Sequence, residues 1–197
     1  MAQVLKQAVR ARIEDAALSC FAADGYEGTT MAAIATAAGT ATANVYRYFA
    51  SKQELFATVV PQQLREAHDR LLDARIEALG TAPAGAAAAG ELLDFWIAHR
   101  LAVVVLLGRA EGTTFADYPA AFVQRLVRHT ERLLDGEPST AQREVLELVF
   151  DNTRRAIARI LFSGKDSEQI RALVTVFWSY QVPGLDGLVA HLRTNPP

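Results

Sequence analysis

Residues 40–56 read TATANVYRYFASKQELF, and they place Asn, Tyr, Arg and Tyr on one very short helical turn. On a helical wheel Val45 and Phe49 share one face at i, i+4 and can pack on a neighbouring helix. Asn44, Tyr46 and Arg47 occupy the opposite arc. A segment this short buries little surface. It therefore either fills a corner of a small core or presents its polar arc to a partner outside the protein.

The residues before this stretch predict two more helices. Residues 5–24 carry an apolar side chain every four or so positions, which is typical of an amphipathic helix, and Gly25 follows it. Thr29 or Thr30 can cap a second helix over 31–38. Gly39 stops that helix and supplies the turn.

The third short helix, about 41–48, then completes a helix-turn-helix, a motif whose second helix lies in the DNA major groove. Asn44 suits bidentate pairing with adenine, and Arg47 suits guanine or a phosphate. Ser51 and Glu54 form a capping-box pattern that opens the next helix.

Three runs of residues resemble one known signature. They are GYEGTT (25–30), IATAAG (34–39) and NVYRYFASKQELF (44–56), and together they are similar to the N-terminal motif of the TetR (tetracycline repressor) family of transcriptional regulators. The resemblance covers about residues 8–60; the rest matches in length and helix content alone. It implies a homodimer on a (pseudo)palindromic DNA operator, a C-terminal helical domain that binds a small-molecule effector, and repression relieved by that effector.

The resemblance also implies roles for particular residues. Tyr46 and Tyr48 match aromatic positions that contact phosphate, Lys52 matches a lysine at the start of helix four, and Thr30 matches a phosphate-contacting threonine. The base-reading surface comprises Thr42, Ala43, Asn44 and Arg47.

Two positions depart from the family pattern. The family usually has Val-Ser where this chain has Thr40-Ala41, so the usual serine cap is missing, and Thr40 or Thr42 is the available substitute. The family often has glycine at Ala43. Both departures bear on base preference rather than on DNA binding itself.

The remaining chain predicts an all-α fold of about nine helices. A long helix over 52–79 is followed by a glycine- and alanine-rich loose connection at 80–90. We expect a helix-turn-helix DNA-binding domain over 1–51 and a ligand-binding and dimerisation domain over 52–197. Further helices are expected over 91–107, 119–134, 140–162 and 167–181, the last capped by Ser167 and ended near Pro183-Gly184 before a final turn at 185–193.

Aromatic residues on the middle helices mark a candidate effector pocket. An apolar pocket with one histidine and one arginine suits a hydrophobic or weakly acidic molecule. The expected ligand-binding residues are Phe95, Trp96, His99, Arg100, Phe115, Tyr118 and Phe122.

Two helices, about 140–162 and 167–182, have apolar faces too wide for one neighbour. In a two-fold dimer the partner's pair covers the second face, which gives a four-helix bundle. A core helix of a monomer is the alternative.

Composition bounds the function. Net charge is −2, and residues 1–56 carry five basic and five acidic side chains, so DNA binding depends on local arrangement. Cys20 is the single cysteine and the four histidines lack metal-ligand spacing, so neither a metal nor another cofactor is expected. The longest apolar run, 101–107, is too short to cross a bilayer, and a cytoplasmic protein without a membrane partner is expected.

Two other classes of function stay open on sequence alone. A helical ligand-binding or adaptor protein without specific DNA binding is compatible with the neutral head and with Ala41. An enzyme on a helical bundle is disfavoured, because the sequence has no G-x-S-x-G, no P-loop and no convincing nucleophile–base pair, so no catalytic residue is assigned.

Overall fold

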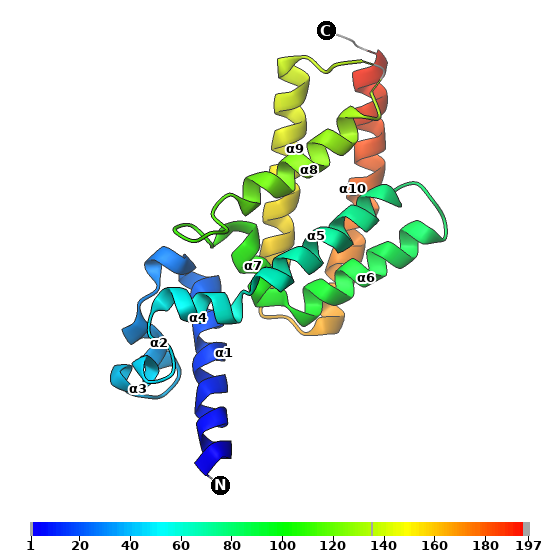
Figure 1. The fold of residues 1–197 in the computed structure, drawn as a ribbon. Helices are drawn as coiled ribbons and strands as arrows, with labels where there is room; N and C mark the ends of the chain where they lie inside the picture. Colours follow the sequence, from blue (N-terminus) through cyan, green and yellow to red (C-terminus); the bar gives the residue numbers. More distant parts are fainter. Residues whose placement is uncertain (1, 135, 195–197) are drawn as a thin grey trace.

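The computed structural model describes residues 2–134 and 136–194, and every regular element in them is a helix (Figure 1). The ends of the two expected domains, at residue 1 and at 195–197, lie outside this part of the chain. The ten helices are α1 (Ala2–Gly28), α2 (Met31–Ala37), α3 (Thr42–Tyr46), α4 (Lys52–Val59), α5 (Gln62–Glu77), α6 (Ala84–Ala98), α7 (Arg100–Gly108), α8 (Tyr118–Glu131), α9 (Thr140–Leu161) and α10 (Ser167–Thr194).

Helices α1 to α4 form a small head at one end of the molecule, and α1 packs against both α2 and α4 (Figure 1). Its core is built from side chains that are fully buried, including Phe21 of α1, Ile34 of α2 and Leu55 of α4. The short helix α3 packs on α2. The expected three-helix helix-turn-helix head is confirmed.

Gly25 interrupts α1 near its end, at φ 77° and ψ 166°. A left-handed φ is one that L side chains rarely adopt, so glycine suits this kink. Beyond it, the Tyr26 N–H donates a hydrogen bond of 2.9 Å to the carbonyl oxygen of Arg109 at the end of α7. The kink therefore anchors the head to the larger body of α5 to α10.

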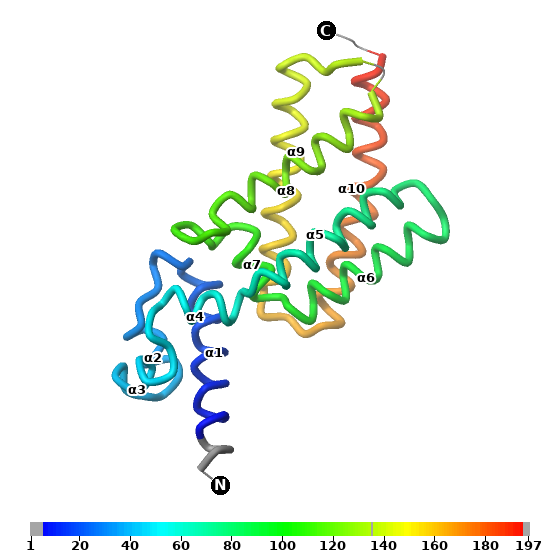
Figure 2. The backbone as a smooth tube through the Cα atoms, in the orientation of Figure 1, coloured from blue at the N-terminus to red at the C-terminus, as the bar shows by residue number. Residues whose placement is uncertain are grey.

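The single helix expected over 52–79 is wrong, because the chain breaks between α4 and α5 (Figure 2). Val60 has φ −127° and ψ 71°, outside the helical region, and Pro61 precedes the first residue of α5. Proline disfavours helical geometry in the residue before it and has no N–H to continue the hydrogen-bond ladder. Helix α4 thus stays with the head, and α5 begins the body.

Two other expected boundaries differ. The loose connection at 80–90 is shorter, since α6 starts at Ala84, and the helix expected over 91–107 divides at His99. The change of direction at His99 lets α6 face α5 while six consecutive residues of α7, from Ala102 to Leu107, are all buried. A straight helix does not bury both segments.

The last helix is longer than expected. Helix α10 continues through Pro183, and Val189 and Leu192 beyond it are buried. Packing in the body outweighs the cost of a proline in the helix. The cap of α10 is also not Ser167 as expected: the Asp166 carboxylate accepts from the Gln169 N–H at 2.9 Å.

Helices α9 and α10 lie side by side at one face of the body (Figure 1). Six of the eight large apolar side chains exposed in the described residues are on or directly after these two helices. None of the described helices has both the length and the apolar character needed to cross a bilayer. The six exposed side chains are Val145, Leu148, Phe162, Leu173, Val176 and Tyr180.

Candidate nucleic-acid interface and effector cavity

Helix α3 has one buried face and one exposed face. Val45 and Phe49 are 0% and 1% exposed, and burying each of them contributes about 1.5–3 kcal/mol to folding. On the other side, the Tyr46 side chain is 53% exposed, more than any other aromatic side chain in the described part of the head. Arg47 beside it is also exposed. Of the other residues in and just after α3 that are predicted to contact DNA, Ala43 is exposed, and Thr42, Asn44 and Tyr48 are half-buried.

The start of α3 differs from the expected cap. Ala41 is the N-cap residue and makes no side-chain capping bond, so neither Thr40 nor Thr42 replaces the family's serine. Thr40 instead accepts a hydrogen bond of 2.8 Å at Oγ1 from Nδ2 of Asn44. The hydroxyl therefore orients the amide of Asn44 rather than the backbone.

Thr30 caps α2, as one of the two expected threonines. Its Oγ1 accepts from the Ala33 N–H at 3.1 Å, and the residue is exposed. The hydroxyl proton is then free to donate outward, for example to a phosphate oxygen. Thr29 turns inward, where its hydroxyl donates to the carbonyl oxygen of Gly25 at 2.7 Å.

Lys52 has a structural role that its sequence position does not reveal. Its Nζ donates to the carbonyl oxygens of Tyr26 at 2.7 Å and Thr29 at 2.8 Å, and it lies 4.2 Å from the centroid of the Tyr26 ring. Two of the three ammonium donors are thus used between α4 and the end of α1. One donor is left for an outside partner.

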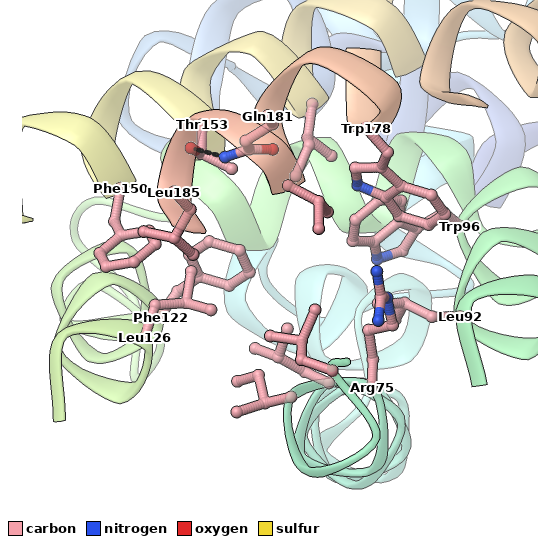
Figure 3. Close-up of a pocket in the computed structure, with 15 residues that line it drawn as sticks. Arg75, Leu92, Trp96, Phe122, Leu126, Phe150, Thr153, Trp178, Gln181 and Leu185 are labelled. Carbon is pink, nitrogen blue, oxygen red and sulfur yellow. Dashed lines mark hydrogen bonds between the residues drawn. The ribbon is translucent and has the colours of Figure 1, made fainter. Parts of the chain in front are cut away.

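A small apolar cavity of about 80 Å³ lies inside the body, between α5, α6, α8, α9 and α10 (Figure 3). Of the seven residues expected to bind ligand, Trp96 and Phe122 line it. Sequence reasoning did not select the other aromatic rings of the wall, Phe150 and Trp178, nor its polar side chains, Arg75, Thr153 and Gln181.

The other expected ligand residues lie elsewhere. His99 is exposed at the break between α6 and α7, with its ring 4.7 Å from that of Phe95, and Arg100 donates to the carbonyl oxygen of Lys165. Phe115 belongs to an aromatic cluster between body and head, 6.1 Å from Phe56 of α4. It lines a second hollow of about 410 Å³ beside α4.

The seventh expected residue, Tyr118, belongs to a buried polar chain behind the cavity wall. Trp96 Nε1–H donates to Nε2 of His68 at 2.9 Å, and Nδ1 of His68 lies 2.6 Å from the Tyr118 hydroxyl. That hydroxyl donates to Oδ1 of Asp69 at 2.7 Å, which also accepts from Arg125 at 2.8 Å. The chain joins α5, α6 and α8.

The protonation states along this series of hydrogen bonds follow from which groups can donate. Indole Nε1–H can only donate, so Nε2 of His68 is unprotonated and the neutral ring carries its proton on Nδ1. Burial lowers the pKa of His68 to about 4, against the opposing effect of Asp69. Burial, and the hydrogen bond to Asp69 after it, raise the pKa of Tyr118. Both rings are neutral at physiological pH.

His68 was not selected from the sequence, although a local signal exists. His68, Leu72 and Ile76 recur at i, i+4 and i+8, and all three are buried on one face of α5. A histidine that begins a row of buried apolar side chains is itself expected to be buried, and its ring nitrogens then need polar partners from other helices. Those partners are distant in sequence and do not follow from periodicity.

The exposed polar face of α3, on a three-helix core behind a glycine turn, is that of a helix-turn-helix DNA-binding protein. Residues 13–59 match the model of the bacterial regulatory proteins, tetR family. The match covers the helix-turn-helix head and supports assigning the chain to this family of DNA-binding transcriptional regulators.

Solved structures with similarity to the chain include a tetR-family transcriptional regulator from Streptomyces coelicolor, at 22% identity and a TM-score of 0.44, covering 97% of this chain and 90% of that one. NalD, the secondary repressor of the MexAB-OprM multidrug efflux pump in Pseudomonas aeruginosa, is 21% identical with a TM-score of 0.37, covering 94% and 96%. No curated protein matched. The family assignment rests on residues 13–59.

Proposed function

We propose that the protein is a ligand-responsive repressor that binds a (pseudo)palindromic operator as a homodimer and leaves it when a small hydrophobic or weakly acidic molecule enters the body. The observation that carries the proposal is the two-faced character of α3, with Val45 and Phe49 buried and Tyr46 and Arg47 exposed. An exposed aromatic and an arginine on a helix this short serve a partner better than a core.

The proposed DNA contacts divide into two groups. Tyr46, Tyr48, Thr30 and the remaining donor of Lys52 hold phosphates and set the position of the head. Thr42, Ala43, Asn44 and Arg47 face base edges in the major groove. In this arrangement, the hydrogen bond from Asn44 to Thr40 limits the rotamers of the amide before DNA arrives.

The proposed dimer uses α9 and α10. The side chains of Leu148, Val176 and Tyr180 are 66%, 68% and 77% exposed. Exposure of such an apolar surface to water is unfavourable and marks an interaction site. An isologous two-fold contact between these helix pairs buries that surface and forms a four-helix bundle. It also supplies two heads for the two halves of one operator.

The proposed release is a population shift. The effector favours a body conformation in which the two heads no longer fit successive major grooves, and its differential affinity for the two conformations sets the size of the effect. The cavity wall includes Leu72, Arg75 and Ile76 of α5, and the chain through His68 and Trp96 links α5 to α6. Motion of α5 reaches α4 across Pro61.

The alternative is a helical ligand-binding or adaptor protein whose head does not read sequence. The equal number of acidic and basic side chains in residues 1–56, and the use of Lys52 in internal bonds, favour it. We propose two domains over 1–51 and 52–197; the second begins in sequence with α4, although α4 packs on α1 of the head. We also propose that the protein works in the cytoplasm, where its DNA is.

Selection of DNA from a random pool by the purified protein tests the proposal. An enriched inverted repeat is the expected result, and its half-site spacing gives the separation of the heads. Tyr46→Ala removes the exposed ring and should abolish enrichment while leaving thermal stability unchanged. Binding that is salt-sensitive but without an enriched sequence would favour the adaptor.

A further inference from the structure

Among the described residues that line the cavity, one carries a charge: Arg75, through its guanidinium. Figure 3 shows this side chain rising from α5 toward Trp96 and Trp178, and its Cζ lies 5.6 Å from the centroid of a Trp178 ring. The two other polar side chains on the wall bond to each other, since Gln181 Nε2 donates to Oγ1 of Thr153, and the Thr153 hydroxyl donates to the Val149 carbonyl.

Arg75 and Arg125 differ in their ion pairs. Arg125 of α8 contacts two carboxylates, Asp69 at 2.8 Å and Asp73 at 3.4 Å. Within the described residues, no carboxylate lies at ion-pair distance from Arg75, which is half-buried. Burial lowers the pKa of Arg75, yet a guanidinium stays protonated at physiological pH. A partly desolvated cation without a carboxylate is a ready partner for an anion.

The rest of the wall sets the shape of that anion. Four aromatic rings line the cavity, those of Trp96, Phe122, Phe150 and Trp178, and the remaining wall is mainly aliphatic. Its volume of about 80 Å³ is below the roughly 150 Å³ of an apolar cavity that holds benzene. A one-ring molecule with a small charged group therefore enters only if the walls move apart.

We infer that the effector is a one-ring aromatic carboxylate whose ring packs among the four aromatic side chains and whose carboxylate pairs with Arg75. This inference rests on the proposed function, since it names the chemistry of the molecule that controls release. The pairing also explains how a ligand acts on the head: the carboxylate engages α5 directly, and the ring separates α5 from α10.

Both tryptophans of the chain, Trp96 and Trp178, line the cavity, so intrinsic fluorescence reports on it. The probes are benzoate, phenylacetate and salicylate, with benzamide as a neutral match and benzylamine as a cationic one. The full-length protein is titrated with each probe, by fluorescence and by calorimetry. We expect at least one carboxylate to bind, benzamide to bind about tenfold or more weakly, and benzylamine not to bind.

Arg75→Met removes the charge and keeps the length of the side chain. Arg70→Met is the matched control, since Arg70 is exposed on the same helix and does not line the cavity. We expect Arg75→Met to lose the preference for carboxylate over benzamide, Arg75→Lys to retain part of it, and Arg70→Met to leave it unchanged.

Three results would overturn the inference: no carboxylate binding at millimolar concentration, equal binding of benzoate and benzamide, or equal affinities for Arg75→Met and Arg70→Met. Release of operator DNA by a neutral compound would overturn it while leaving the proposed function intact. Failure of the proposed function has a separate signature, the absence of any enriched DNA sequence.

Discussion

The indole Nε1–H of Trp96 donates a 2.9 Å hydrogen bond to Nε2 of His68, and so joins the wall of the cavity to the middle of α5. The bond fixes the tautomer of a fully buried histidine and directs its other nitrogen at Tyr118. One side of Trp96 therefore faces the cavity, and its ring nitrogen belongs to the chain that ends at Asp69 and Arg125.

This relationship predicts an acid-sensitive stability. The pKa of His68 falls from an ordinary value of 6.5 to about 4 in the folded protein, because burial disfavours the charged ring. Between these values the unfolded chain binds more protons than the folded one, so stability is full above pH 6.5 and decreases as pH falls toward 4. The loss attributable to His68 is on the order of 3 kcal/mol. Urea unfolding at a series of pH values measures it.

The matched variant is His68→Phe, which leaves the Trp96 N–H without an acceptor. We expect it to cost about 1–3 kcal/mol at pH 7.5 and to flatten the decrease between pH 6.5 and 4. His129 has a lowered pKa as well, through burial and then the charge of Arg132, and it stays in both proteins, so the difference between them isolates His68. Parallel curves for the two proteins would contradict the assignment.

Lys52 should act on stability as well as on DNA. Lys52→Met removes the hydrogen bonds to the carbonyls of Tyr26 and Thr29, and we expect it to lower the free energy of unfolding by about 1–3 kcal/mol. Lys6→Met, an exposed charge on α1, is the control and should have no such effect. If Lys52→Met weakens DNA binding at unchanged stability, its contact with phosphate matters more than its internal bonds.

Gly39 in the turn of the helix-turn-helix has φ 62°, and a Cβ added there meets no atom within 4 Å. The cost of Gly39→Ala is therefore conformational, about 1–2 kcal/mol for a left-handed L residue. Gly90→Ala is the same chemical change inside α6, where a Cβ also meets nothing, and it should stabilise by up to about 1 kcal/mol. Thermal unfolding of the two variants should thus shift in opposite directions.

The surface of α9 and α10 predicts the effect of a buried charge on assembly. Leu148→Glu combined with Val176→Glu places two carboxylates in the proposed interface, and we expect a monomer at micromolar concentration by sedimentation, with operator affinity reduced to that of one head. Leu133→Glu is the control, because Leu133 is 41% exposed, like Val145, but follows α8. A dimer that survives the double change would exclude this interface.

The head could be predicted from sequence because local rules decide it. Thr30 caps α2, Gly39 takes a left-handed turn, and Ser51 caps α4 by accepting from the Glu54 N–H at 3.1 Å. The two capping bonds each span three residues, and the Gly39 turn depends on the conformation of a single residue. A motif made of such local features can be recognised from the amino-acid sequence alone.

The cavity could not be predicted in the same way. His68 is 50 positions from Tyr118 in the sequence and 28 from Trp96. Contacts over such separations produce no periodic pattern of residues that could be recognised in the sequence. Trp96 and Phe122 were found because large aromatic side chains favour the interior. Arg75 was missed, since an arginine on a helix usually belongs to the solvated surface and only the packed walls distinguish it.

The break at Val60 and Pro61 is a natural junction for exchanging the head or the body between regulators. The family match ends at residue 59, where α4 also ends. A chimaera joined at this proline would keep the DNA specificity of one regulator and the chemical sensitivity of another. Such a graft must also carry a partner for Phe56, because the ring of Phe115 from the body lies against it.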